Sequence, residues 1–156
     1  MNVHQRALVK STFDRLRPIP KSAGVVFYER LFELDPALRR LFRGSVENQA
    51  AMFVTALNMV VAEFVEQGFV PQSVRDLGSR HEGYGVEDPS YETFGEALLW
   101  TLGRLLGAHF TPEVRDAWSA AYEALAAAMK QAAAETRETR AAAESGGPRP
   151  GGLPPG

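Results

Sequence analysis

One histidine of this chain lies where it could bind a group inside a helical core. The 156 residues contain three histidines, and His81 shares one side of a predicted helix with apolar and aromatic neighbours. These neighbours are Val74, Leu77 and Tyr84, at spacings that return to the same side of an α-helix. A buried neutral imidazole needs a partner, which can be a backbone carbonyl, a water or a metal ion. The residues alone therefore leave two interpretations open, a hydrogen-bonded core histidine and a metal ligand.

Other kinds of chemical site lack the residues that they need. The chain has no cysteine, which excludes disulfides, thiolate nucleophiles, cysteine-bound iron–sulfur clusters and thiolate-bound haem. His4 lies in a polar first turn and His109 lies between two predicted helices, so we expect both side chains to be exposed. Because no two histidines stand three or four residues apart and no carboxylates cluster, we predict no non-haem metal site. The glycine cluster near the end follows no strand, so we predict no phosphate-binding loop.

Length and composition indicate one soluble domain. A chain of 156 residues with 45% hydrophobic content can bury one substantial core. The net charge of −2 comes from intermixed acids and bases, so we expect no nucleic-acid partner. We read no stretch as reaching the roughly 18 apolar residues that span a bilayer, and we therefore expect a cytoplasmic protein without a membrane contact.

Proline, glycine and capping residues divide the chain into about seven helices of unequal length. Asp35-Pro36, Asp88-Pro89 and Thr111-Pro112 each place an acceptor side chain before a first-turn proline. The predicted helices cover residues 7–16, 21–32, 37–42, 46–65, 72–83, 88–105 and 111–143. Unequal helices with broad apolar sides favour an all-α fold with steep crossings over an up-down bundle.

The end of the chain differs in composition from the rest. Alanine-rich sequence extends the last helix, and glycine and proline then dominate up to residue 156. Such a segment cannot bury enough apolar surface to become ordered. We therefore expect a folded domain over residues 1–134, followed by a helix extension and a disordered tail over residues 135–156.

Three motifs resemble those of bacterial single-domain globins and of the neuroglobin-related branch. The first is Gly24-Val25-Val26-Phe27-Tyr28-Glu29-Arg30-Leu31-Phe32, and the second is Asp35-Pro36 followed by Leu41-Phe42. The third is Leu77-Gly78-Ser79-Arg80-His81, followed by Tyr84-Gly85-Val86. The likeness runs from about residue 7 to residue 129, and the order and separations of the motifs are more specific than any one of them. It implies a globin fold around a pocket for haem b.

The resemblance also implies a role for four residues of that pocket. His81 would bind the haem iron through Nε2 and leave the opposite coordination position for a gas. Phe42 corresponds to the phenylalanine that stacks on haem, although an ordinary core phenylalanine would be buried in the same way. Tyr28 and Gln49 correspond to a polar pair that donates hydrogen bonds to dioxygen, whose outer oxygen carries partial negative charge. Taken alone, Tyr28 could equally be a core residue whose hydroxyl binds a backbone carbonyl.

Further pocket residues follow from the same resemblance: Phe53, Leu77, Val86 and Tyr91. Phe53 is larger than the aliphatic residue of many relatives, which favours a tight pocket. The default globin arrangement implies a hydrogen bond from His81 to a backbone carbonyl near Leu77.

Tyr91 corresponds to a tyrosine that relatives with a flavin reductase domain place behind the histidine. There, a carboxylate of the last helix completes a hydrogen-bonded triad that makes the imidazole more electron-donating. In this chain Ala133 occupies the carboxylate position, and Glu135 points about 200° around the helix. We therefore expect an incomplete triad and no strong activation of bound oxygen.

The resulting functional hypothesis is a haem-b globin that binds dioxygen, NO and CO reversibly. Conversion of NO to nitrate would need a separate reductase, because the chain has no dinucleotide-binding motif and no room for a flavin domain. The choice between carrier and enzyme stays open. A gas sensor or interaction module and a haem-free protein of globin shape are alternatives, and the sequence does not decide between monomer and homodimer.

Overall fold

The computed structural model describes residues 1–42 and 44–146, and this part of the chain contains helices and no strand. The predicted tail beyond residue 146 lies outside the described residues. Six α-helices form the fold: α1 (Val3–Asp14), α2 (Pro20–Leu34), α3 (Val46–Met59), α4 (Gln72–Gly83), α5 (Asp88–Leu106) and α6 (Pro112–Ser145). Three shorter segments join them: the 3-10 helices η1 (Pro36–Leu41) and η3 (Gly107–His109), and the π-helical η2 (Val60–Val65). The prediction of an all-α fold is thus confirmed.

Side-chain caps begin three of the six α-helices, α1, α3 and α6, and the 3-10 helix η1. The Asp35 side chain accepts a hydrogen bond from the Ala37 backbone N–H, and Thr111 accepts one from that of Val114. Each caps otherwise unpaired N–H groups of a first turn that also contains proline. Pro20 is the first residue of α2, where its missing N–H has no cost.

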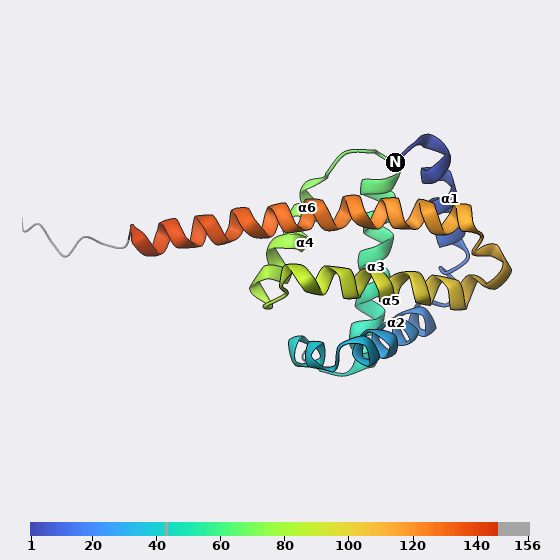
Figure 1. Cartoon of the computed structure of the whole chain (residues 1–156), viewed down its shortest axis with the longest axis horizontal. Coiled ribbons are helices and arrows are strands. Elements are labelled where there is room, and N and C mark those ends of the chain that lie inside the picture. The colour runs from blue at the N-terminus through green and yellow to red at the C-terminus, as the bar shows by residue number, and fades with distance from the viewer. Residues whose placement is uncertain (43, 147–156) are drawn as a thin grey trace, which may run out of the picture.

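Close contacts between backbones set two of the helix crossings. A Cβ built on Gly24 of α2 would lie 2.5 Å from the Ala50 Cα of α3. A Cβ on Gly78 of α4 would likewise lie 2.5 Å from the Met129 carbonyl oxygen of α6. Glycine is required at both points because a side chain would separate the helices. Figure 1 shows α5 and α6 crossing α3 at a steep angle, as the unequal helix lengths predicted.

The interior forms one apolar cluster to which all six helices contribute. Its largest fully buried side chains are Phe13, Leu31, Leu102, Val9, Val61, Val65 and Val74. Within it, the Trp118 indole N–H of α6 donates to the Thr12 hydroxyl of α1 over 2.9 Å. This bond joins the first helix to the last and satisfies a buried donor.

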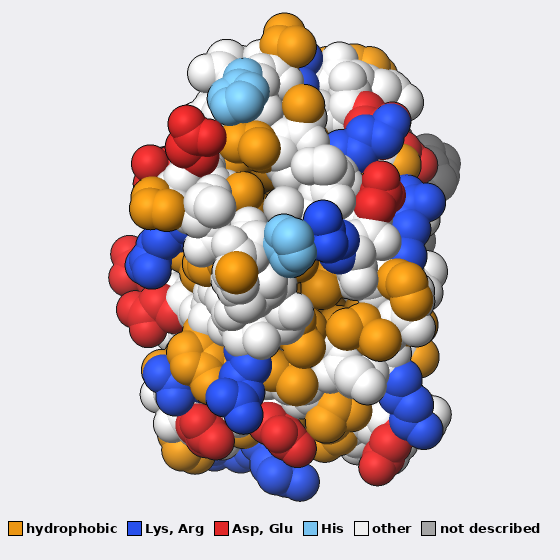
Figure 2. Space-filling view, turned by 90° about the vertical axis from the view of Figure 1, so that its right-hand side faces the viewer, with side chains coloured by type: hydrophobic (Ala, Val, Ile, Leu, Met, Phe, Trp, Pro, Cys, Tyr) orange, Lys and Arg blue, Asp and Glu red, His pale blue; other side chains and the backbone are white. Residues whose placement is uncertain are grey.

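The long segment formed by α3 and η2 corrects one expectation from composition. By length and hydropathy alone, Val46–Val65 could cross a membrane. From the sequence we predict no stretch that is long and apolar enough to do so. A helix that crosses a protein core meets the same criterion, and here α3 packs on α2 at Gly24 and Ala50. Figure 2 shows one surface of the molecule, on which basic and acidic side chains are interspersed among apolar ones.

The placement of Tyr84 corrects a second expectation. We predicted an inward side chain from its spacing to His81, but Tyr84 is 64% exposed. The helical spacing no longer applies there, because α4 ends at Gly83 and Tyr84 is its capping residue. At the other end of the chain, the last turns of α6 project beyond the body formed by the other helices (Figure 1).

Candidate functional site

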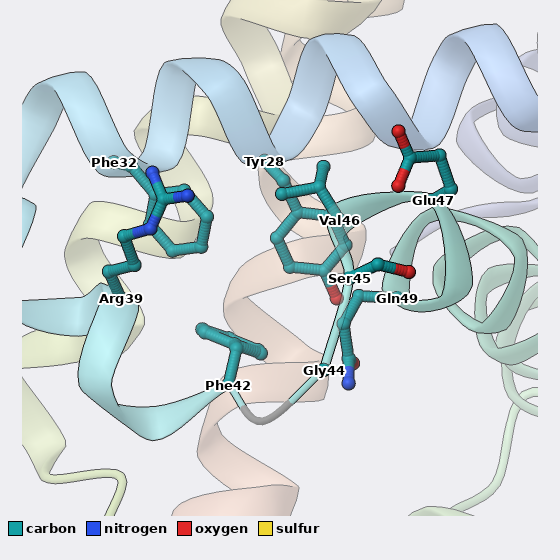
Figure 3. A pocket seen from close by; sticks show the side chains of 9 residues that line it. All are labelled: Tyr28, Phe32, Arg39, Phe42, Gly44, Ser45, Val46, Glu47 and Gln49. Atoms are coloured by element: carbon teal, nitrogen blue, oxygen red, sulfur yellow. The ribbon is translucent and has the colours of Figure 1, made fainter.

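A cavity of about 310 Å³ lies between α2, η1 and the start of α3. Three residues of the predicted pocket line it together: Tyr28 from α2, Phe42 after η1, and Gln49 from α3. In Figure 3 the Tyr28 and Gln49 side chains both point away from α2 toward the segment that carries Phe42. The remaining lining residues are Phe32, Arg39, Gly44, Ser45, Val46 and Glu47. The structure therefore brings the predicted polar pair and the predicted stacking ring to one cavity.

Tyr28 is a buried phenol that faces this cavity. Its side chain is only 7% exposed, and its hydroxyl makes no hydrogen bond to residues 1–42 or 44–146. The backbone carbonyl that an ordinary core tyrosine would use is therefore not found in the described part of the chain. Burial raises the pKa of Tyr28 to about 12, because the phenolate would be poorly solvated there. The hydroxyl is consequently protonated at neutral pH and can donate a hydrogen bond into the cavity.

Aromatic rings surround Tyr28 on several sides. The Phe42 ring meets it edge-on with centroids 5.2 Å apart, and the Phe53 ring does so at 6.0 Å. Phe53 stacks on Phe27 with centroids 4.1 Å apart and ring planes within 7° of parallel. Of these rings, Phe42 lines the cavity and would keep water from a group bound there, whereas Phe53 is not among the lining residues. The Phe53 ring occupies space beside Tyr28, and the tight pocket expected from its size stays a prediction.

His81 lies on α4 with one ring nitrogen paired and the other available. Its Nδ1 is 2.8 Å from the Leu77 carbonyl oxygen, and since a carbonyl can only accept, Nδ1 carries the proton. Nε2 then presents a lone pair, and no partner for it occurs within the described ranges. Burial lowers the pKa of His81, the Leu77 hydrogen bond opposes that change, and the charge of Arg80 adds to it. The neutral imidazole, with Nε2 as a potential metal ligand, is the favoured form.

The turn after α4 approaches the segment that carries Phe42. Gly85 has a φ of +88°, and a Cβ built on it would lie 3.6 Å from the Leu41 side chain. Val86 is buried, and its N–H donates to the His81 carbonyl over 3.0 Å. His81 itself is not among the residues that line the 310 Å³ cavity. The two groups of predicted site residues thus lie on different helices that meet at this turn.

Tyr91 occupies a different environment from the one that a triad requires. Its side chain is 3% exposed and its hydroxyl has no hydrogen-bond partner among the described residues. Burial and, to a smaller extent, the charge of Asp88 raise the pKa of Tyr91 and Arg137 lowers it, with a net value of about 12. On α6, Ala133 is buried and Glu135 is exposed, so neither supplies a carboxylate to the hydroxyl.

Sequence reasoning missed the contact that does reach Tyr91. The Tyr122 hydroxyl of α6 donates a hydrogen bond to the Tyr91 backbone carbonyl, and the Lys130 Nζ lies 5.6 Å from the Tyr91 ring centre. The only sequence signal was the position of Tyr122 on the inner side of the last helix. His4 and His109 are exposed, as predicted, and the nearest recorded partner of His4 is Glu113 at 3.9 Å.

The donor set of this region fits a haem. It offers one neutral imidazole with an open Nε2 on α4, and aromatic rings from α2, α3 and the segment after η1. No group of three His, Cys, Asp or Glu residues within 1–42 and 44–146 could hold a metal ion without help. A metal bound at His81 would therefore need most of its ligands from a macrocycle, as haem iron has them.

The fold combines steeply crossing helices with one histidine whose Nε2 can bind a metal and with a buried tyrosine. This combination is typical of a haem-binding helical protein of globin type. The globin family model matches residues 25–129, and the chain belongs to the globin family. This confirms the family resemblance that the three motifs indicated.

Relatives in animals and plants agree with this assignment. The chain is 31% identical to a neuroglobin of Tetraodon nigroviridis, over 87% of its own length and 94% of the relative's. It is 32% identical to a neuroglobin of Chaenocephalus aceratus over the same shares. It is also 31% identical to leghemoglobin 2 of Sesbania rostrata, over 82% of its own length and 95% of the relative's. The placement within a bacterial branch stays a prediction.

Proposed function

We propose that this globin binds haem b through His81 and takes up dioxygen, NO and CO reversibly in the cavity beside Tyr28 and Gln49. The observation that carries the proposal is the orientation of His81: the Leu77 carbonyl holds Nδ1–H, and Nε2 has no partner among the described residues. When bound, haem supplies an iron with one coordination position open to a gas. His81, Phe42 and Phe53 would hold the macrocycle, and Leu77 and Val86 would support it from α4 and the turn after it.

The distal residues act as hydrogen-bond donors and as a barrier to water. The Tyr28 hydroxyl is protonated, buried and directed into the cavity, so it stabilises a ligand whose outer atom is partly negative. Gln49 adds an amide on the same cavity, and the Phe42 ring excludes water from it. These hydrogen bonds should slow the release of dioxygen more than that of CO, because CO carries less negative charge on its outer atom.

The test is reconstitution of the purified haem-free chain with haem, followed by spectra of the ferric, ferrous, oxygenated and CO-bound forms. His81→Ala should lose stoichiometric haem and the spectrum of a histidine-ligated iron. The matched control is His109→Ala, which changes an exposed histidine and should behave as the unsubstituted protein. A colourless unsubstituted protein that takes up no haem would overturn the proposal, as would a His81→Ala variant with unchanged haem content and ligation.

NO dioxygenation is the enzymatic extension of this proposal. Each conversion of NO and dioxygen to nitrate would consume one electron, which a separate reductase would have to supply. The unpartnered Tyr91 hydroxyl argues against a strongly electron-donating His81, which makes reversible binding the better supported activity. Nitrate formation with a flavin reductase added, compared with the same mixture without it, separates the enzyme from the carrier.

A further inference from the structure

We infer that Thr136 and Arg140, near the end of α6, are positioning residues that hold α4 on either side of His81. The inference rests on the proposed role of His81 as the haem ligand. It assigns a function to the part of α6 after residue 133, which the globin family match does not include and of which only the last turns project from the helical body (Figure 1).

The buried packing of α4 lies before His81. Of its twelve residues, only Val74 and Gly78 are buried, and both precede His81. Gly78 lies against the backbone of Met129, so the helix crossing itself is close at that point. The turn that contains His81 and the residues after it therefore depends on other interactions to stay against α6.

Two polar contacts supply those interactions. The Thr136 and Ser79 hydroxyl oxygens are 2.8 Å apart, two residues before His81. One residue after His81, Glu82 receives both terminal nitrogens of Arg140, with Nη2–Oε2 at 2.6 Å and Nη1–Oε1 at 3.3 Å. A guanidinium that binds a carboxylate through both nitrogens fixes orientation as well as distance.

The burial of Glu82 strengthens the second contact. Its side chain is only 10% exposed, whereas that of Arg140 is 52% exposed. A carboxylate so far removed from water needs a partner, and Arg140 is the cation that the structure pairs with it. Met129, Thr136 and Arg140 are spaced by seven and four residues, so they share the side of α6 that faces α4.

These contacts restrict how α4 can move relative to α6. Ser79 and Glu82, on either side of His81 in the sequence, both contact α6. The imidazole therefore cannot shift toward or away from a bound iron without lengthening one of these two contacts. Loss of these two contacts should let the last turn of α4 open more often, and it should weaken the bond between the imidazole and the iron.

The experiment combines Thr136→Val with Arg140→Gln in the full-length protein. The matched control combines Thr139→Val with Arg115→Gln, which changes the same residue types at exposed positions of α6. In the haem-free protein, hydrogen exchange at the amides of residues 79–84 should become several-fold faster in the first variant and stay unchanged in the control. In the ferrous haem-bound protein, the iron–histidine stretching band in the resonance Raman spectrum should move to lower frequency in the first variant only.

Exchange of the two charges provides a rescue test. Glu82→Arg with Arg140→Glu restores an ion pair with reversed polarity, and it should return both readouts toward those of the unsubstituted protein. Unchanged exchange at residues 79–84 in the Thr136→Val, Arg140→Gln variant would overturn the inference, as would faster exchange with an unmoved Raman band. The exchange measurement needs no haem. A failure to bind haem would therefore contradict the proposed function through a different measurement from the one that tests this inference.

Discussion

His81 and Leu77, one turn apart on α4, are joined by a 2.8 Å contact between the imidazole Nδ1 and the backbone carbonyl oxygen. This contact fixes the tautomer of the ring and directs Nε2 away from the helix that carries it. The same carbonyl limits rotation of the ring, so a ligand bond at Nε2 would form with little further loss of side-chain freedom.

Tyr28→Phe should speed the release of dioxygen by about tenfold, which corresponds to the loss of one hydrogen bond worth about 1.4 kcal/mol. CO release should change much less, because CO accepts a weaker hydrogen bond. Stopped-flow displacement of dioxygen by CO measures the rate, and Tyr84→Phe is the control because Tyr84 is 64% exposed. Equal effects on both gases would show that Tyr28 acts only by filling space.

The raised pKa of Tyr28 predicts a difference in stability at alkaline pH. Its folded-state pKa of about 12 lies above the ordinary value of 10.0, so the folded chain keeps the phenol proton where the unfolded chain loses it. The stability from the protonated phenol is full below pH 10.0 and is lost as the pH rises through about 12. Relative to Tyr28→Phe, the unsubstituted protein should lose up to about 1.4 kcal/mol per pH unit in this window. Urea unfolding at a series of pH values measures it, and parallel curves would contradict the burial of the phenol.

Tyr91→Phe should leave the free energy of unfolding unchanged or raise it by about 1 kcal/mol. The Tyr91 hydroxyl is buried without a partner among the described residues, and such a group costs stability. Tyr122→Phe is the matched comparison, because its hydroxyl donates to the Tyr91 carbonyl, and it should cost about 1 kcal/mol. Thermal and urea unfolding of the haem-free chains give both values. A large loss in Tyr91→Phe would mean that its hydroxyl has a partner after all.

Gly24→Ala should destabilise the fold by about 2 kcal/mol or more. The new Cβ would lie 2.5 Å from the Ala50 Cα, so α2 and α3 would have to separate, and overpacking outweighs the gain in helix propensity. Gly83→Ala is the control, because its Cβ meets nothing within 4 Å. That substitution should be neutral or slightly stabilising in the same urea titrations, and a similar loss in both variants would contradict the close crossing.

Short-range chemistry explains what could be predicted from the residues. Prolines, N-caps and glycines act within one helical turn, so Asp35, Thr111 and Gly107 mark helix boundaries wherever the helices later pack. Periodicity likewise distinguished His81 from the two exposed histidines, and the motif spacing was enough to indicate the family.

The tertiary structure alone decided several of the contacts between helices. The outward turn of Tyr84 depends on where α4 ends, and the pairing of Tyr122 with the Tyr91 carbonyl depends on how α5 meets α6. Ser79 and Thr136, 57 residues apart, are both ordinary surface residues in a sequence pattern. Such contacts follow from the angles and distances at which helices cross, which the close contacts at Gly24 and Gly78 set and which no local pattern encodes.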